Sequence, residues 1–297
     1  MQKILIGQGH PLLAQSLADR LQGQVIPTTL TLDSQGELLL SFDTHQLTHQ
    51  DVVIIQSLIP PLHNCLMEVF LLTHAAKSAQ ARSITLVLPY YAYGRQDHPT
   101  LDCTGTAAAL LPSLFKAAGA DRLITVDVHQ PSLFKDSSLS IKFLSAVPKF
   151  TETLSSCISN TVIIAPDQGA VERAKNMASQ LQVPLVCLNK KRGKRKITFD
   201  LVSGYVQGKT CYLVDDILDS GRTICSAADF LKKHGAQSVQ AFVTHGLFAK
   251  GSMQRIQKSF LSSLTVSNSV PPPKSCSSKV HWLDITSLLA KSLYLSK

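Results

Sequence analysis

Long apolar runs are missing from this 297-residue sequence. No stretch approaches the roughly 18 apolar residues that a helix needs to cross a bilayer. The opening residues form a short apolar run that Gly7, Gly9 and Pro11 interrupt, which is typical of a strand, a turn and a helix rather than of a signal peptide. We therefore expect a chain with neither a leader nor a membrane partner.

Cysteines are few and scattered. The chain has 7 of them, an odd number, with no CxxC pair and no grouping of Cys and His at the spacing of a zinc site. Disulfides and structural zinc are therefore not expected. Reduced thiols of this kind fit a cytoplasmic protein best.

Aromatic residues are also scarce, at 6%, whereas basic residues outnumber acidic ones by 29 to 20. The resulting net charge of +9 favours anionic partners, such as nucleic acid, a membrane surface or phosphorylated small molecules. No basic patch with interleaved aromatics is present, so we do not expect nucleic-acid binding, and phosphorylated small molecules are favoured. The hydrophobic fraction of 44% is enough for a core and excludes a disordered chain.

Short apolar runs alternate with helical patterns along the chain. The strand candidates are residues 3–7, 51–57, 83–89, 121–128, 161–167, 185–189, 210–216 and 239–245. The helix candidates are residues 10–22, 62–81, 105–118, 168–182, 223–234 and 282–293. This alternation predicts an α/β fold with mainly parallel sheets flanked by helices. The strands fall into two groups, and the weakly patterned stretch 130–158 between them predicts two similar domains, 1–145 and 146–297.

The strongest chemical signal is the segment 211–236, CYLVDDILDSGRTICSAADFLKKHGA. An apolar strand ends in Asp215 and Asp216, and a short polar loop leads into a helix. The loop consists of Asp219, Ser220, Gly221, Arg222 and Thr223. Backbone N–H groups and hydroxyls at a helix N-terminus form an anion site, and the two carboxylates can accept sugar hydroxyls or lie near Mg²⁺. The simpler interpretation is that Asp219 or Ser220 only caps the helix.

Five motifs in order extend this pattern over nearly the whole chain: PYYAYGRQD (89–97), ITVDVHQPSLF (124–134), IIAPDQGAVERA (163–174), LVDDILDSGRTI (213–224) and VTHGLF (243–248). In these motifs the chain resembles the ribose-phosphate pyrophosphokinases (PRPP synthetases), which have the type I phosphoribosyltransferase-like fold. The resemblance implies transfer of the β,γ-pyrophosphoryl group of Mg-ATP to the C1 hydroxyl of ribose 5-phosphate, giving PRPP and AMP. It also implies a homo-oligomer, a dimer or a hexamer, with Mg²⁺ as cofactor.

The resemblance implies a role for each matching residue. Arg95 and Gln96 match the family's ATP-contacting pair, and His129 matches its site near the Mg-ATP phosphates. Asp127, His129 and Asp167 match metal-linked positions. The ribose 5-phosphate site would comprise Asp215, Asp216, Asp219, Ser220, Gly221, Arg222 and Thr223. The ATP side would lie in the N-terminal domain, and the sugar-phosphate site and catalytic loop in the C-terminal one.

A basic run, NKKRGKRK (189–196), lies between the strand candidate 185–189 and a second strand pattern. By itself, such a run is usually a solvated face or a nucleic-acid patch. Its place predicts a hairpin-like loop, which matches the family's catalytic loop. Lys190 and Arg192 occupy the catalytic positions, where they would stabilise charge on the transferred group.

The adenine-binding segment matches less well. Gln35, Gly36 and Glu37 match the end of the family's pattern, whereas Asp33 stands where the family has an aromatic residue. Two alternatives to an active synthetase follow. One is a non-catalytic regulatory paralogue, which this divergence favours. The other is a PRPP-consuming phosphoribosyltransferase, which the DSGRT loop alone does not exclude.

Overall fold

The computed structural model describes the chain except for residues 97–106, 136, 155–157, 193–196, 202–203 and 295–297. The chain divides into two compact units. Unit 1 comprises Met1–Leu144, Ser269–Pro271 and Thr286–Lys297, and unit 2 comprises Ser145–Asn268 and Pro272–Ile285. This differs from an expected single domain over 146–297, because the last helix of the chain belongs to unit 1.

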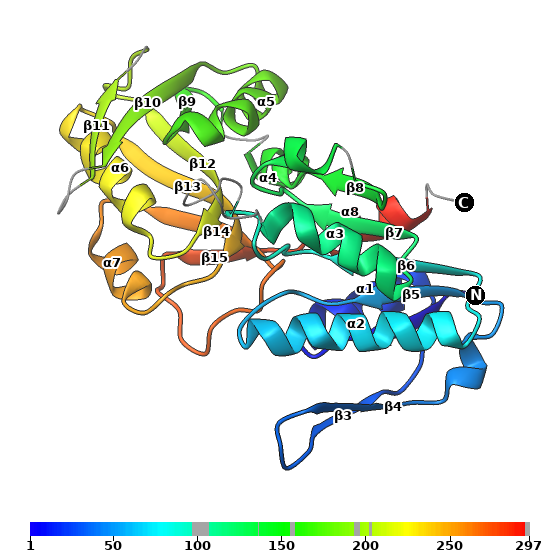
Figure 1. Ribbon diagram of the computed structural model, residues 1–297. Helices are drawn as coiled ribbons and strands as arrows, with labels where there is room; N and C mark the ends of the chain where they lie inside the picture. The colour runs from blue at the N-terminus through cyan, green and yellow to red at the C-terminus, as the bar shows by residue number, and fades with distance from the viewer. Residues whose placement is uncertain (97–106, 136, 155–157, 193–196, 202–203, 295–297) are drawn as a thin grey trace. The chain divides into compact units, whose positions relative to one another are not determined.

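A six-stranded, all-parallel sheet in the order β2-β1-β5-β6-β7-β8 forms the centre of unit 1 (Figure 1). Its strands are β1 (Lys3–Ile6), β2 (Gln24–Val25), β5 (Asp51–Ile55), β6 (Ser83–Leu88), β7 (Arg122–Val126) and β8 (Ser140–Leu144). The inner strands are apolar at nearly every position and almost fully buried. Parallel strands need this composition because helices cover both faces of the sheet.

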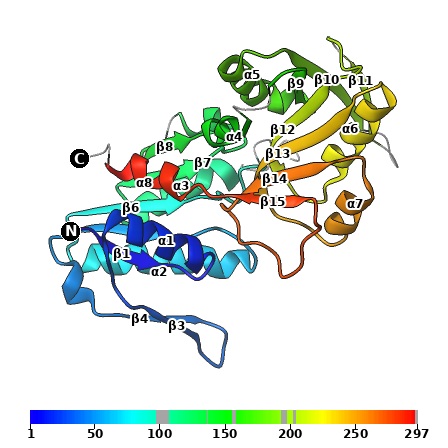
Figure 2. The ribbon, with the colours of Figure 1, turned by 180° about the vertical axis from the view of Figure 1, so that it is seen from behind.

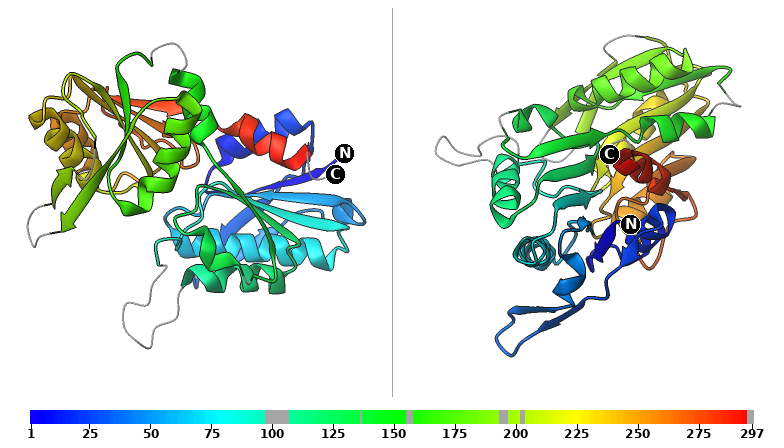
Figure 3. Two further views of the ribbon diagram at one scale, coloured as in Figure 1. Left: turned by 90° about the horizontal axis from the view of Figure 1, so that it is seen from above. Right: turned by 90° about the vertical axis from the view of Figure 1, so that its right-hand side faces the viewer.

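Two pairs of helices cover the two faces of this sheet. On one face lie α1 (Pro11–Leu21) and α8 (Thr286–Tyr294), and on the other lie α2 (Leu62–Ser78) and α3 (Ala107–Ala118), as Figure 3 shows. The 3₁₀ turns η1 (Thr44–Leu47) and η2 (Pro131–Phe134) lie in the connections. One face of the sheet is thus covered by helices from the two ends of the described chain, and the other face by α2 and α3.

Helix α8 is attached to unit 1 by apolar and polar contacts. Leu289 and Leu293 are buried. The Tyr294 hydroxyl donates to the Arg20 carbonyl at 2.9 Å, and Lys142 Nζ donates to the Ser292 carbonyl at 3.1 Å. The end of the chain therefore completes the N-terminal unit.

A β-hairpin, β3 (Thr29–Leu32) and β4 (Leu38–Ser41), forms a separate two-stranded sheet that extends away from the body of unit 1 (Figures 1 and 2). The Asp33 carboxylate accepts the backbone N–H groups of Gln35 and Glu37, both at 2.8 Å. Asp33, which stands in place of an aromatic, therefore closes the turn of the hairpin.

A seven-stranded sheet in the order β11-β10-β9-β12-β13-β14-β15 forms the centre of unit 2, and only the β10–β11 pair is antiparallel. Its strands are β9 (Thr161–Ala165), β10 (Leu185–Arg192), β11 (Ile197–Leu201), β12 (Thr210–Leu218), β13 (Ser238–Gly246), β14 (Ser263–Ser267) and β15 (Val280–Leu283). The other elements of unit 2 are α4 (Val147–Leu154), η3 (Gln168–Ala170), α5 (Val171–Leu181), α6 (Arg222–Lys233) and α7 (Ser252–Lys258).

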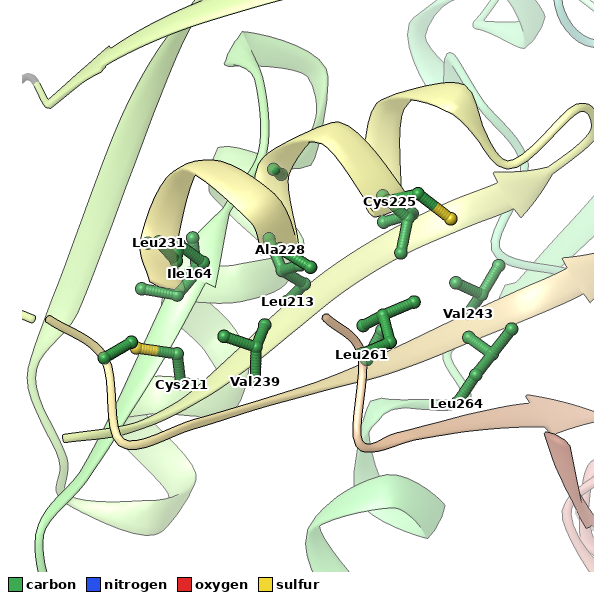
Figure 4. Packing of buried hydrophobic residues seen from close by; sticks show 14 of the residues in the cluster. Ile164, Cys211, Leu213, Cys225, Ala228, Leu231, Val239, Val243, Leu261 and Leu264 are labelled. Atoms are coloured by element: carbon green, nitrogen blue, oxygen red, sulfur yellow. The ribbon is translucent and has the colours of Figure 1, made fainter. Parts of the chain in front are cut away.

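Both faces of β12 and β13 are packed. Figure 4 shows Ala228 and Leu231 of α6 against Leu213 and Val239 of the sheet. On the opposite face, the Phe242 ring lies 4.9 Å from that of Phe150 and 5.5 Å from that of Tyr212, between ring centroids. Burying a large apolar side chain stabilises the fold by about 1.5–3 kcal/mol, so this double packing holds β12 firmly.

The α/β class with mainly parallel sheets is confirmed, and each of the eight expected strands is present. The expected helix over 282–293 starts too early, because residues up to Leu283 pair with β14 as β15 and α8 begins at Thr286. The stretch 130–158 holds β8 and α4, which its weak pattern did not predict. None of the described helices has the length and apolar character to cross a bilayer.

Candidate active site

The carboxyl ends of neighbouring strands of unit 2 bring several of the predicted residues together. Lys190 lies in β10 and Asp167 follows β9, its parallel neighbour. The Lys190 Nζ atom is 2.9 Å from Asp167 Oδ2, and the lysine side chain is only 9% exposed. The sheet thus joins an amine and a carboxylate that lie 23 residues apart in the sequence.

A pair of carboxylates lies in the next strand, β12. The Asp216 N–H donates to Asp215 Oδ1 at 3.0 Å, and Asp216 itself is buried. Burial, followed by the negative charges of Asp216 and Asp167, raises the pKa of Asp215 well above its ordinary value, while the positive charge of Arg173 opposes this rise. The carboxylates of this edge are therefore close enough to influence one another's ionisation.

Arg173 is a residue of the site that the motif comparison did not single out. It lies in the first turn of α5, and its Nη2 atom is 3.9 Å from Asp216 Oδ2. Both side chains are shielded from solvent, with exposed fractions of 12% and 6%. One sequence signal could have indicated Arg173. It is a basic residue in the first turn of a helix, and that helix follows a strand whose end carries an acidic residue, Asp167.

The loop 219–223 joins the end of β12 to α6. Its N-cap is Gly221, which has a left-handed φ of +72° and no side-chain cap hydrogen bond. The N-cap is therefore neither Asp219 nor Ser220, although Ser220 Oγ accepts the Arg222 N–H at 3.5 Å. Arg222 and Thr223 open the helix, so the whole loop lies at a helix N-terminus, where backbone N–H groups are directed outward.

The described part of the basic run, residues 189–192, lies in β10, which pairs antiparallel with β11. The strand extends further than expected, because β10 continues through Lys190 and Lys191 to Arg192, and residues 193–196 lie outside the described chain. Lys191 follows Lys190 in the strand, so their side chains point to opposite faces of the sheet. The Lys191 Nζ atom forms an exposed ion pair with Asp200 Oδ2 at 2.6 Å. The backbone of Arg192 pairs with Ile197.

The predicted ATP-side residues lie in unit 1, at the ends of β6 and β7. Asp127 directly follows β7 with a positive φ of +39°, and its N–H donates to the Leu144 carbonyl at 2.9 Å. Arg95 and Gln96 are exposed in the turn after β6. A Cβ placed on Gly94 would lie 3.9 Å from Val128 Cγ1, so this turn lies beside the 127–129 segment that includes His129.

The structure separates the remaining ATP-side residues from these strand ends. Gln35, Gly36 and Glu37 occupy the tip of the β3–β4 hairpin. Within the described residues, no three His, Cys, Asp or Glu side chains come together as ligands of one metal ion. Asp127 and His129 belong to unit 1 and Asp167 to unit 2.

Comparisons with known proteins agree with this arrangement. Residues 2–119 match the family model described as the N-terminal domain of ribose phosphate pyrophosphokinase, and residues 142–272 match a phosphoribosyl transferase domain. A ribose-phosphate pyrophosphokinase of Maricaulis maris is 35% identical over 98% of this chain and 95% of its own. The chain belongs to the ribose-phosphate pyrophosphokinase family.

Further members of the ribose-phosphate pyrophosphokinase family match over similar lengths. One from Bradyrhizobium diazoefficiens is 34% identical, over 98% of this chain and 93% of its own. The crystal structure of phosphoribosylpyrophosphate synthetase from Mycobacterium smegmatis superimposes with a TM-score of 0.92 at 31% identity, covering 99% of this chain and 97% of that one. The resemblance inferred from the five motifs is thereby confirmed, as is membership of an enzyme family.

Proposed function

We propose that this chain transfers the β,γ-pyrophosphoryl group of Mg-ATP to the C1 hydroxyl of ribose 5-phosphate. In this reaction the hydroxyl oxygen bonds to the β-phosphorus and its proton is released to solvent, while the bond from that phosphorus to the α,β-bridging oxygen breaks. AMP leaves with that oxygen as PRPP forms. The observation that carries the proposal is the convergence of Lys190, Asp167 and the Asp215–Asp216 pair at one edge of unit 2, next to the loop 219–223.

The loop 219–223 is the proposed site of the 5-phosphate. A helix N-terminus supplies N–H donors and a favourable dipole for an anion, and the hydroxyls of Ser220 and Thr223 add further donors. The carboxylates of Asp215 and Asp216 would accept hydrogen bonds from the ribose hydroxyls. Phosphate at one end and hydroxyl acceptors at the other suit a sugar phosphate rather than a free anion. Asp219 and Arg222 complete the proposed site.

Lys190 is the proposed catalytic cation, with Arg192 beside it in the chain. Phosphoryl chemistry depends on charge stabilisation and positioning more than on covalent catalysis. The contact between Lys190 and Asp167 supports this role, because it holds the amine at the same edge as the sugar-phosphate carboxylates. Lys190 would stabilise the negative charge that develops on the transferred group.

We further propose that Arg95, Gln96 and His129 contact ATP, with the hairpin residues Gln35, Gly36 and Glu37 at the adenine. The residues proposed to serve Mg²⁺ are Asp127 and His129 in unit 1 and Asp167 in unit 2, each taken by itself. The donor set fits this ion, because Mg²⁺ takes oxygen ligands, usually from one or two carboxylates and substrate phosphates, and keeps several waters. The ion would neutralise phosphate charge during the transfer.

Self-association into a dimer or a hexamer is also proposed. Leu32 and Leu39 of the hairpin are 57% and 52% exposed, and an isolated two-stranded hairpin is marginally stable in water. Leu32→Ser combined with Leu39→Ser should lower the sedimentation coefficient of the assembly. The control is Leu12→Ser, at a leucine of α1 that is 76% exposed. This variant should leave the sedimentation coefficient unchanged.

A phosphorus NMR time course with Mg²⁺, ATP and ribose 5-phosphate tests the reaction. AMP and PRPP should appear together, and Lys190→Ala should slow their formation by at least about 100-fold, as loss of one transition-state donor does in other enzymes. Lys191→Ala is the matched control, because its side chain pairs with Asp200 and its loss should leave most of the rate.

Two outcomes would redirect the proposal. Binding of ribose 5-phosphate without formation of PRPP would favour a non-catalytic paralogue. Consumption of added PRPP together with a nucleobase would favour a phosphoribosyltransferase.

A further inference from the structure

The backbone of the loop after β12 is held from behind by the segment 247–255. Three successive carbonyls, of residues 218–220, each accept a hydrogen bond from this segment. The donors are the Leu247 N–H at 2.8 Å, the Ala249 N–H at 3.0 Å and the guanidinium of Arg255. Arg255 is the one side chain among these donors, and it binds the carbonyl closest to the helix.

The position of Arg255 is itself fixed by packing. It lies in α7, and the next residue, Ile256, is fully buried. A Cβ placed on Gly221 would lie 3.8 Å from Ile256 Cγ1, so α7 forms the wall behind the N-cap of α6. The guanidinium is therefore presented to the loop from a supported helix.

Peptide geometry connects this contact to the opposite side of the loop. In a planar trans peptide unit, the C=O and the following N–H point in opposite directions. Anchoring the carbonyls of residues 218–220 behind the loop therefore directs the next three N–H groups, of residues 219–221, away from α7. The N–H groups of Ser220 and Gly221 have no acceptor within the described part of the protein. Successive N–H groups that point to one side form an anion-binding concavity.

We propose that Arg255 is a positioning residue for the sugar-phosphate site, an inference that rests on the function proposed above. It acts through the Ser220 carbonyl and not by touching the substrate. Its bond fixes the direction of the Gly221 N–H. The positive charge at the oxygen end of that peptide also polarises it and strengthens the N–H as a donor to phosphate. Arginine suits this role because its guanidinium stays protonated and has a fixed planar geometry.

Three variants test this role: Arg255→Met, Arg255→Lys and, as control, Lys258→Met, at an exposed residue in the last turn of the same helix. The readouts are kcat, the KM values for ribose 5-phosphate and ATP, and calorimetric titration with ribose 5-phosphate alone. Arg255→Met should raise the Kd and KM for ribose 5-phosphate by up to about 10- to 100-fold, the limit reached if the whole contribution of the lost charged hydrogen bond is taken from binding. The KM for ATP should stay unchanged.

Arg255→Lys retains the charge and should recover part of the lost affinity for ribose 5-phosphate. Such recovery shows that the loss in Arg255→Met comes from the missing charge and hydrogen bond and not from misfolding. Equal affinity of the Arg255→Met and Lys258→Met proteins for ribose 5-phosphate would overturn the inference. So would parallel rises in both KM values, because a general structural defect has that effect. Absence of ribose 5-phosphate binding by the unaltered protein would instead overturn the proposed function, so the two failures are distinguishable.

Discussion

Gly221→Ala offers a quantitative test of the phosphate loop. Gly221 has a φ of +72°, and a Cβ placed there would make only ordinary contacts, at 3.8 Å from Cys225 Sγ, 3.8 Å from Ile256 Cγ1 and 3.9 Å from Leu218 Cδ2. Alanine therefore fits the space, and its cost is that of the backbone conformation. A left-handed conformation costs a non-glycine residue roughly 1–2 kcal/mol.

Gly208 provides the matched control. Its φ is +71°, no heavy atom lies within 4 Å of a Cβ placed there, and it precedes the other end of the same strand, β12. Gly208→Ala introduces the same backbone strain away from the proposed site. We expect its free energy of unfolding, measured in urea, to fall by about 1–2 kcal/mol without a change in the affinity for ribose 5-phosphate.

In Gly221→Ala, the same backbone strain should lower both the free energy of unfolding and the affinity for ribose 5-phosphate. The loop can relax by leaving the left-handed region, which rotates the Gly221 N–H, and the ligand must then restore the strained form. Affinity for ribose 5-phosphate, measured by calorimetry, should fall by up to about 5- to 30-fold, the factor that corresponds to 1–2 kcal/mol. Equal affinities of the two alanine variants would refute the reasoning that this turn forms the phosphate site.

Two further predictions concern carboxyl groups, that of the partly buried Asp215 and that of the buried Glu68. The raised pKa of Asp215 means that the folded state retains a proton that the unfolded state has released, so stability falls as the pH rises from about 4 through the raised pKa. Asp215→Asn should remove this fall in the free energy of unfolding with rising pH; unfolding free energies of the variant and the wild type that run parallel across pH would contradict this. Glu68 accepts the Gln8 N–H at 3.0 Å and the Gln56 amide. Glu68→Gln should cost about 1–3 kcal/mol in urea unfolding, because the new NH₂ faces a donor in either orientation, the Gln56 amide at Oε2 or the Gln8 N–H at Oε1; an unchanged midpoint would show that the network rearranges.

The local part of the site could be predicted from the sequence, because its residues are contiguous. The apolar run that ends in Asp215 and Asp216, and the DSGRT loop that follows, lie in one stretch of chain. Runs buried on both faces also indicated the eight strands. Such patterns depend only on neighbouring residues, which a single sequence contains.

The contacts that complete the site depend on strand order and helix placement, which the sequence does not reveal. Lys190 meets Asp167 only because β10 lies beside β9, and Arg255 meets Ser220 across 35 residues. The motif comparison also did not reveal that Asp33 closes the hairpin turn by accepting the N–H groups of Gln35 and Glu37. Strands β14 and β15 escaped prediction because they are short and only partly buried at alternate positions.

The return of α8 to unit 1 has a consequence for synthesis on the ribosome. Leu144 and Thr286 are 142 positions apart (286 − 144), and all strands of unit 2 are made between them. At roughly 5–20 residues per second, this interval lasts about 7–28 s. During this time unit 1 lacks α8, and the surface that this helix covers in the finished protein is exposed to solvent. The N-terminal unit is thus the first to be translated and the last to be finished.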